Sequence, residues 1–89
     1  MRKLDLTRDA VKFLGNLDAK QFRQVVNKVL GLAEHPRPVD SKMLHGADFL
    51  RADVGEYRII YRFDDDCLYV ALIGKRNDDE VYRKLSRKT

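Results

Sequence analysis

The sequence predicts an α+β domain in which a hairpin of two helices packs on one face of a small, mainly antiparallel sheet of four strands. Apolar residues first recur at helical spacing, two prolines then end this pattern, and from Phe49 onward apolar and polar residues alternate. One helical layer on one sheet accommodates both patterns. Because 89 residues enclose only one hydrophobic core, we expect a single domain spanning residues 1–89. The expected order is β-α-α-β-β-β, followed by a short C-terminal helix.

The chain is expected to begin with a short strand and a helix. The stretch RKLDL, residues 2–6, alternates in polarity as a strand does. Thr7 is placed to cap the helix that follows, and Gly15 and Asn16 mark the end of that helix. The apolar residues at helical spacing are Ala10, Phe13, Leu14 and Leu17.

The second helix is expected to begin at Asp18. Gln21 follows three residues later, which is the spacing of a capping box. Pro36 and Pro38 end the helix because proline cannot continue it. The two helices are joined so closely that they should form an antiparallel hairpin. The apolar stripe of the second helix consists of Phe22, Val25, Val26, Val29, Leu32 and Ala33.

The second half of the chain predicts a β-meander with tight turns at Gly55-Glu56 and at residues 64–66. The stretch from residue 67 to 73 is apolar on both faces, which suits an interior strand, and Gly74 is the expected site of a bulge. The C-terminal helix should start near Asp79. The residues expected to lie opposite each other across the first turn are Val54 and Tyr57, Asp53 and Arg58, and Arg51 and Ile60.

The pleat of this hairpin separates two faces with different chemistry. The helix hairpin should cover one face, and the other should remain open to solvent because the domain has only one helical layer. The face expected under the helices carries Leu50, Ala52, Val54, Tyr57, Ile59, Tyr61 and Phe63. The open face carries Arg51, Asp53, Arg58, Ile60 and Arg62.

The net charge of +4 and the isoelectric point near 9.4 favour a polyanionic partner. No apolar run is long enough to span a membrane, and the first residues lack the apolar stretch of a secretory signal, so a cytoplasmic location is expected. The end of the chain is basic without an acidic residue, which is typical either of a polyanion-binding segment or of a solvated tail. Its cations are Arg83, Lys84, Arg87 and Lys88.

The chain offers little to a metal ion or to a cysteine nucleophile. Cys67 is the only cysteine and follows three aspartates, which disfavour a thiolate, so we interpret it as a packed strand residue. His35 and His45 lie in separate loops without an acidic pair at ligand spacing. We therefore expect no metal and no cofactor.

The open face could hold a phosphodiester, because guanidinium groups bind phosphate oxygens in pairs. Lys75 and Arg76 follow the last strand and add two cations to the same sheet. The simpler interpretation of Arg58 is an exposed ion pair with Asp53. Tyr82 is placed to stack on a base or exchange a proton, or else to pack on the rim of the sheet.

Three motifs resemble the RelE/ParE superfamily of bacterial toxin–antitoxin toxins over nearly the whole chain. They are MLHG at residues 43–46, GEYRIIYRFDDD at residues 55–66, and IGKRNDDEVY at residues 73–82. The third motif is similar to the RelE branch. The resemblance implies a toxin that enters the 70S ribosome and cleaves mRNA in the A site, without a metal, by attack of the ribose 2′-OH on the adjacent phosphate. It also implies a cognate antitoxin as partner in a hetero-oligomer.

The resemblance assigns roles to individual residues. It implies that Arg51, Arg58, Arg76 and Tyr82 form the catalytic group, in which the arginines stabilise phosphate charge and cannot accept a proton. Asp53 stands where RelE relatives commonly have a cation, so Asp53 is either a general base or a counterion of Arg58. The residues expected to bind RNA are Lys75, Arg62, Arg83, Lys84, Arg87 and Lys88.

Two alternative functions stay open at this point. One is a ParE-like inhibitor of gyrase without nuclease activity, since the same fold and strand arginine occur in both branches. The other is an inactive relative that only binds its antitoxin, which the unusual Asp53 favours. Proton acceptors other than Asp53 are Tyr82 and, if it is desolvated, Lys75.

Overall fold

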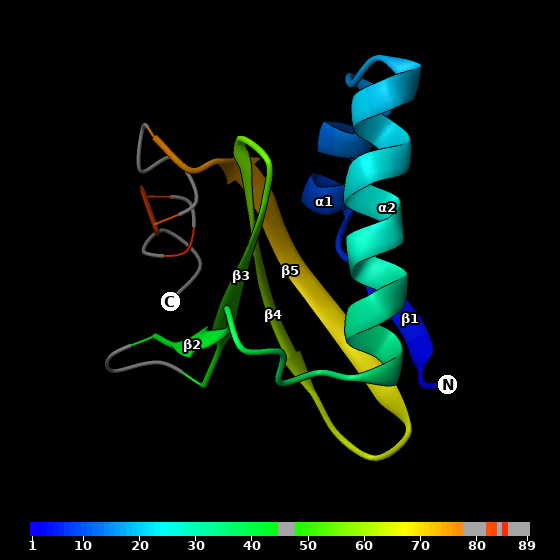
Figure 1. Ribbon diagram of the computed structural model, residues 1–89, viewed down its shortest axis with the longest axis vertical. Helices are drawn as coiled ribbons and strands as arrows, with labels where there is room; N and C mark the ends of the chain where they lie inside the picture. Colours follow the sequence, from blue (N-terminus) through cyan, green and yellow to red (C-terminus); the bar gives the residue numbers. More distant parts are fainter. Residues whose placement is uncertain (45–47, 78–81, 84, 86–89) are drawn as a thin grey trace.

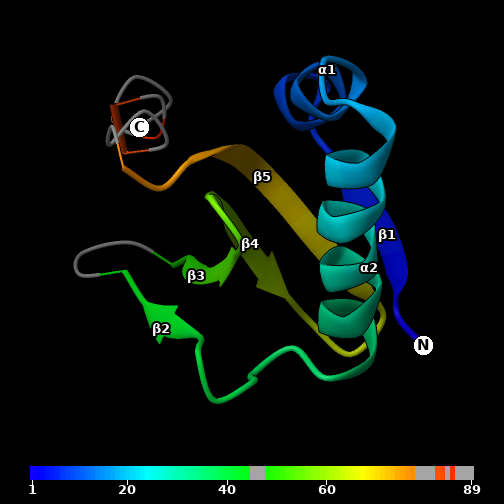
Figure 2. The same ribbon diagram turned by 45° about the horizontal axis from the view of Figure 1, so that its top comes forward.

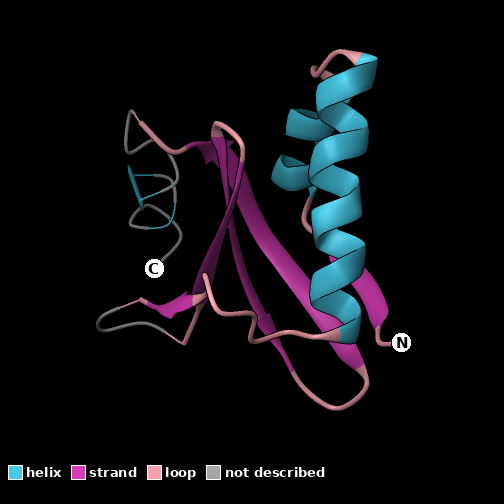
Figure 3. Ribbon diagram, viewed as in Figure 1, coloured by secondary structure: helices cyan, strands magenta, loops and turns pink. Residues whose placement is uncertain are grey.

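A computed structural model of the chain describes residues 1–44, 48–77, 82, 83 and 85 (Figure 1). Two helices pack on one side of a five-stranded sheet (Figure 3), which confirms the predicted α+β class and helical layer. The elements in chain order are β1 (Lys3–Leu6), α1 (Arg8–Gly15), α2 (Ala19–Glu34), β2 (Lys42–Met43), β3 (Leu50–Val54), β4 (Tyr57–Phe63) and β5 (Cys67–Lys75).

The sheet has the strand order β1-β5-β4-β3-β2, which can be followed from β1 to β2 in Figure 2. β1 runs parallel to β5, and the other neighbours are antiparallel. The predicted number of four strands is wrong, because Lys42 and Met43 form an additional edge strand that pairs with β3. A strand of two residues has no alternating pattern, so the sequence contains no signal for it.

Both helices begin at the predicted capping residues. The Thr7 hydroxyl oxygen accepts the Ala10 N–H at 3.2 Å, and the Asp18 carboxylate accepts the Gln21 N–H at 2.9 Å. α2 ends at Glu34, two residues before the first proline, as predicted. Among the described residues, no helix is long and apolar enough to cross a membrane.

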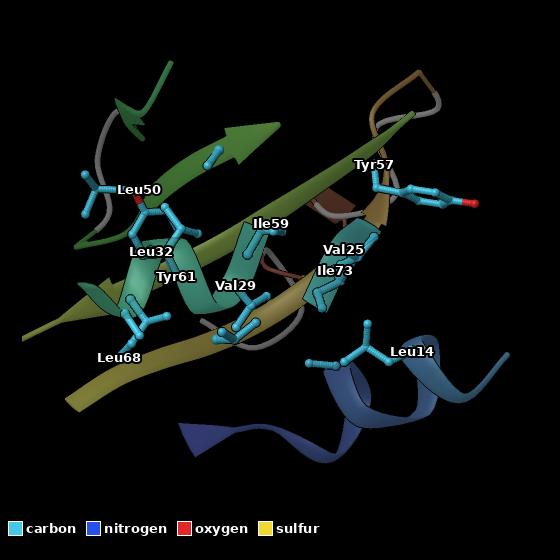
Figure 4. Close-up of a cluster of buried hydrophobic side chains, with 14 residues drawn as sticks. Leu14, Val25, Val29, Leu32, Leu50, Tyr57, Ile59, Tyr61, Leu68 and Ile73 are labelled. Atoms are coloured by element: carbon cyan, nitrogen blue, oxygen red, sulfur yellow. The ribbon is translucent and has the colours of Figure 1, made fainter. Parts of the chain in front are cut away.

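The main core lies between the helices and the sheet (Figure 4) and has the composition that the alternation predicts. Every residue expected on the covered face of β3 and β4 is buried or packs against this core. One member of the predicted helical stripe differs, because Phe22 in the first turn of α2 is 41% exposed. The buried part of the stripe consists of Val25, Val29, Leu32 and Ala33.

The opposite face of the sheet is not fully open, so that prediction is wrong in part. Ile60 and Leu72 are completely buried there, and Leu85 from the C-terminal region packs on them. Tyr82 and Leu85 therefore lie on the side of the sheet away from the helix-side core. Alternation predicts the face on which Ile60 lies, but it contains no information about which distant segment covers that face.

β5 contains a bulge, but at a different position from the predicted one. The register with β4 shifts between Ile60, which pairs with Leu72, and Tyr61, which pairs with Val70. Ala71 is therefore the extra residue, whereas Gly74 pairs regularly with Arg58. Because both faces of β5 are apolar, the change of alternation leaves no mark in the sequence.

Most of the predicted C-terminal helix lies outside the described residues, since its expected start near Asp79 is among residues 78–81. Tyr82, Arg83 and Leu85 are in helical conformation.

Candidate active site

The β3–β4 hairpin places three charged side chains on the face away from the helices. Asp53 pairs with Arg58 and Arg51 with Ile60, which confirms the predicted register. The turn depends on Gly55, whose φ of +56° lies in the left-handed region that glycine adopts without strain. A shift by one residue would move all three charges under the helices, so this turn positions the site.

Arg58 binds Asp53 in the two-pronged geometry of a guanidinium–carboxylate pair. Its Nε donates to Asp53 Oδ1 at 2.7 Å and its Nη2 to Oδ2 at 3.1 Å. The side chain of Arg58 is 13% exposed and that of Asp53 is 32% exposed. Two bonds to one carboxylate fix the plane of the guanidinium, and they leave Nη1 free to point elsewhere.

The free Nη1 of Arg58 and a second arginine converge on Tyr82. Arg58 Nη1 donates to the phenol oxygen at 2.7 Å, and Arg51 Nη1 donates to the same oxygen at 2.9 Å. The guanidinium carbon of Arg58 also lies 5.5 Å from the centre of the Tyr82 ring. Because the phenol oxygen accepts both bonds, its own proton is left for another acceptor.

Arg76 lies at the edge of this group. Its backbone N–H donates to the Glu56 carbonyl at 3.0 Å, and its Nη1 donates to the Gly55 carbonyl at 3.3 Å. The side chain is exposed and rests against the β3–β4 turn. The positive charge of Arg76 nevertheless lowers the pKa of Asp53.

The arginines hold the pKa of Asp53 below its ordinary value. The hydrogen bonds from Arg58 are the largest cause, and the charges of Arg58, Arg76 and Arg51 lower the pKa further. The same hydrogen bonds raise the pKa of Arg58. Both groups are therefore charged at neutral pH, and the Asp53 carboxylate is a weak proton acceptor there.

The other predicted RNA-binding residues do not join this cluster. Arg62 lies on the same face but packs against the rings of Phe49 and Tyr69. Lys75 pairs with Tyr57, a residue of the helix-side core, so it occupies the covered face at an exposed end of the sheet. Arg83 is exposed. Lys84, Arg87 and Lys88 lie outside the described residues.

Sequence reasoning missed the apolar group that positions Tyr82. Tyr82 packs against the small core of Ile60, Leu72 and Leu85, so Leu85 holds the segment that carries the phenol on the sheet. A signal was present, because Leu85 is an apolar residue one helical turn after Tyr82 in an otherwise basic stretch.

Candidate metal ligands and nucleophiles are scarce in the part of the chain that the structure describes. There, no three His, Cys, Asp or Glu side chains gather in a group that could hold a metal ion. Cys67 is the first residue of β5 and is half-buried with a free thiol, which agrees with its interpretation as a strand residue.

A family model described as the ParE toxin of type II toxin–antitoxin systems, parDE, matches residues 4–80. This match includes Arg51, Asp53, Arg58 and Arg76 and ends two residues before Tyr82. It confirms the predicted membership of the RelE/ParE superfamily. No curated protein sequence matches the chain significantly.

Solved structures of RelE toxins share the fold. A free mutant form of Escherichia coli RelE is 24% identical, with a TM-score of 0.80 over 98% of this chain and 96% of RelE. The RelBE2 toxin–antitoxin complex of Mycobacterium tuberculosis contains a chain that is 25% identical, with a TM-score of 0.73 over 84% of this chain and 98% of that one. The archaeal RelE–RelB complex of Pyrococcus horikoshii contains one with 25% identity and a TM-score of 0.73, over 86% and 97%.

Proposed function

We propose that this chain, which belongs to the family of ParE toxins of type II toxin–antitoxin systems, is an endoribonuclease that cleaves mRNA in the ribosomal A site. The observation that carries the proposal is the convergence of the Arg51 and Arg58 guanidinium groups on one phenol oxygen, at 2.9 and 2.7 Å. Both guanidinium groups retain further N–H donors beside this phenol, and these donors form a site for the oxygens of one phosphate.

The arginines supply electrostatic stabilisation in the proposed reaction. Attack of the ribose 2′ oxygen on phosphorus forms one P–O bond and breaks the bond to O5′, leaving a 2′,3′-cyclic phosphate and a 5′-OH. Negative charge increases on the phosphate oxygens in the transition state. Arg51 and Arg58 stay protonated throughout and stabilise this charge, and Arg76 adds a third cation at the edge of the site.

The proton transfers are assigned to Tyr82 rather than to Asp53. The Asp53 carboxylate is bound by Arg58 and its pKa is lowered, which makes it a poor base at neutral pH. Asp53 instead orients Arg58 so that its Nη1 points toward Tyr82. The phenol donates its proton to the departing O5′, and the phenolate oxygen, which two guanidinium groups hold in place, takes up the proton that the 2′-OH loses.

The proposed partners follow from the family and from this substrate. Solved complexes pair RelE chains with RelB antitoxins. We propose that this toxin likewise binds a cognate antitoxin in a hetero-oligomer, and that its free form acts on mRNA in the 70S ribosome. The activity would then take place in the cytoplasm, where ribosomes translate the message.

The test is a cleavage assay with the purified chain and translating ribosomes. Mapping the ends of the message should reveal cuts within the A-site codon, with a 5′-OH on the downstream fragment and a cyclic phosphate on the upstream one. Addition of a chelator separates a metal-independent reaction from contamination by a metal nuclease. An intact message at toxin concentrations that saturate the ribosomes would overturn the proposal.

A second function is favoured by the family model, which describes a ParE toxin. A ParE-like inhibitor of gyrase would block DNA supercoiling and leave the message intact. The Arg58–Asp53 pair favours a third function, an inactive relative that only binds its antitoxin, because the carboxylate already occupies two donors of Arg58. A supercoiling assay beside the cleavage assay separates these functions, since the third would affect neither.

A further inference from the structure

A second group of planar and charged side chains lies on the same face of the sheet, away from Tyr82. Asp5 of β1 pairs with Tyr69 of β5, and Tyr69 pairs with Arg62 of β4. The guanidinium carbon of Arg62 is 5.3 Å from the centre of the Tyr69 ring and 5.8 Å from that of Phe49, which precedes β3. The pairing thus aligns an acid, an aromatic ring and a cation in one row across three strands, and the ring of Phe49 continues the row beside Arg62.

This row surrounds a cavity of about 350 Å³. Val70 and Ala71 complete its wall beside Thr7, whose hydroxyl donates to the Ala71 carbonyl at 2.6 Å. The size lies within the range of small-molecule sites, which combine mostly apolar walls with a few polar groups. The bulge at Ala71 is part of this wall, so the irregularity of β5 shapes the cavity.

Two polar groups of the cavity have unused hydrogen-bonding capacity. Within the described part of the chain, the Asp5 carboxylate makes no hydrogen bond or ion pair. Among the same residues, the partners of the Arg62 guanidinium are the two rings, which leave its N–H groups available. An arginine flanked by aromatic rings, in a cavity that an unpaired carboxylate also lines, is suited to a planar ligand that carries hydrogen-bond donors on one edge.

We propose that this cavity is a subsite for an unstacked RNA base and that it prefers guanine. The inference rests on the proposed function, in which the substrate is RNA. The base would stack on Tyr69 and the Arg62 guanidinium, as single-stranded RNA stacks on aromatic and arginine side chains. Asp5 would accept the N1–H and the N2 amino group of guanine, which are two adjacent donors that no other RNA base presents.

The position of the cavity fits a nucleotide close to the scissile one. Arg62 and Arg58 point to the same face four residues apart on β4, which corresponds to about 13 Å along a strand. The Asp5 carboxylate would repel a phosphate, so the cavity favours the base and the arginine cluster favours the backbone. Recognition of the base and reaction at the phosphate are thereby assigned to different rows of one sheet.

The experiment measures binding of hexanucleotides with 2′-O-methyl riboses, which cannot be cleaved by 2′-OH attack. Fluorescence anisotropy compares an all-uridine oligonucleotide with three others that carry a single G, A or C at the fourth position. The full chain should bind the G oligonucleotide at least fivefold more tightly than the others. Tyr69→Ala should weaken its binding about fivefold to a hundredfold, the range for loss of one base–aromatic stack.

Three variants separate the subsite from general charge effects. Tyr69→Phe keeps the ring and should bind as the unchanged chain does. Asp5→Asn should abolish the preference for G without weakening binding of the all-uridine oligonucleotide. Arg23→Ala removes an exposed cation on α2, in the helical layer, and should leave the preference unchanged.

Two results would overturn the subsite: equal affinity for all four oligonucleotides, or equal effects of Tyr69→Ala and Arg23→Ala. Because the assay detects binding and not cleavage, it separates the two proposals. A guanine preference combined with an intact message in the ribosome assay would retain the subsite and reject the nuclease. Cleavage of the message without a guanine preference would retain the nuclease and reject the subsite.

Discussion

The two faces of the β3–β4 hairpin are made from alternating residues of the same strands, yet they are stabilised differently. On the helix side, Ile59 and Tyr61 are fully buried under α2. On the other side, neighbouring Arg58 is held by directed hydrogen bonds to Asp53 and Tyr82. The first face depends on the amount of apolar surface buried, whereas the second depends on the direction of a few bonds.

This difference separates stability from activity along a single strand. Removal of apolar atoms on the helix side should destabilise the domain and leave the chemistry of the surviving folded molecules intact. Removal of a charge on the other side should change the chemistry with a smaller loss of stability, because those side chains are partly hydrated. Variants at the adjacent residues Arg58 and Ile59 test this division between stability and activity.

The largest effect on stability is expected for Ile59→Ala. Ile59 is 0% exposed in the centre of the helix-side core, and such truncations lower the free energy of unfolding by about 2–5 kcal/mol. Urea unfolding monitored by circular dichroism measures the loss. Val11→Ala, at a position that is 55% exposed, is the matched control and should change stability little. Equal losses for the two variants would contradict the assignment of Ile59 to the core.

The next largest effect concerns activity, with Arg58→Ala expected to lower A-site cleavage about a hundredfold. This is the typical cost of removing one preorganised donor from a developing negative charge. Arg58→Lys should fail similarly, because a lysine cannot bind Asp53 and Tyr82 at the same time with a planar fork. Cleavage by both variants is measured under single-turnover conditions.

The control for Arg58→Ala is Arg23→Ala, which removes the same charge from α2. The free energy of unfolding of Arg58→Ala should fall by less than that of Ile59→Ala. A stability loss as large as that of Ile59→Ala, or an unchanged cleavage rate, would remove the distinction between the two faces.

Local pattern was sufficient to predict most of this fold. The caps at Thr7 and Asp18, the end of α2 and the pairing of Asp53 with Arg58 all depend on residues close together in the sequence. The errors have a common physical origin. The edge strand at Lys42–Met43 and the bulge at Ala71 are decided by how each strand pairs with its neighbour in the sheet, and not by the preference of the residues themselves.

The local sequence pattern predicted one part of the site, the charged residues of the β3–β4 hairpin, but not their contact with Tyr82. The positions of Arg51, Asp53 and Arg58 on one face follow from the turn at Gly55 and from strand alternation. The contact of Tyr82 with both arginines bridges separations of 31 and 24 residues, and it depends on the docking of Leu85 in the second core. Packing between distant segments has no period in the sequence, so the indications for Tyr82 were its resemblance to a family and the apolar Leu85 one helical turn later.

A smaller effect is expected for Asp53→Asn, and it distinguishes a counterion from a base. If Asp53 only orients and neutralises Arg58, removal of one negative charge near the phosphate should raise the affinity for RNA about fivefold, which corresponds to roughly 1 kcal/mol. If Asp53 were the general base, the cleavage rate should instead fall by two orders of magnitude or more. Single-turnover cleavage as a function of toxin concentration separates affinity from rate.

The smallest effect is the pH dependence of stability that the Asp53–Arg58 pair produces. Arg58 lowers the pKa of Asp53 in the folded protein below its ordinary value of 3.8. The pair therefore stabilises the fold fully above the unfolded-state pKa of about 4. This contribution is lost as the pH falls through the lower pKa of the folded state. The free energies of unfolding of the unchanged chain and of Asp53→Asn, measured with urea, should therefore differ at pH 7 and 5, and the difference should shrink as the pH falls below about 4. Asp64, whose pKa is lowered chiefly by the Asp66 backbone N–H, is present in both proteins and cancels from the difference. If the difference in the free energy of unfolding stayed the same in acid, Asp53 would stabilise the hairpin through packing and not through its charge. The polar face would then be stabilised by packing, as the apolar face is.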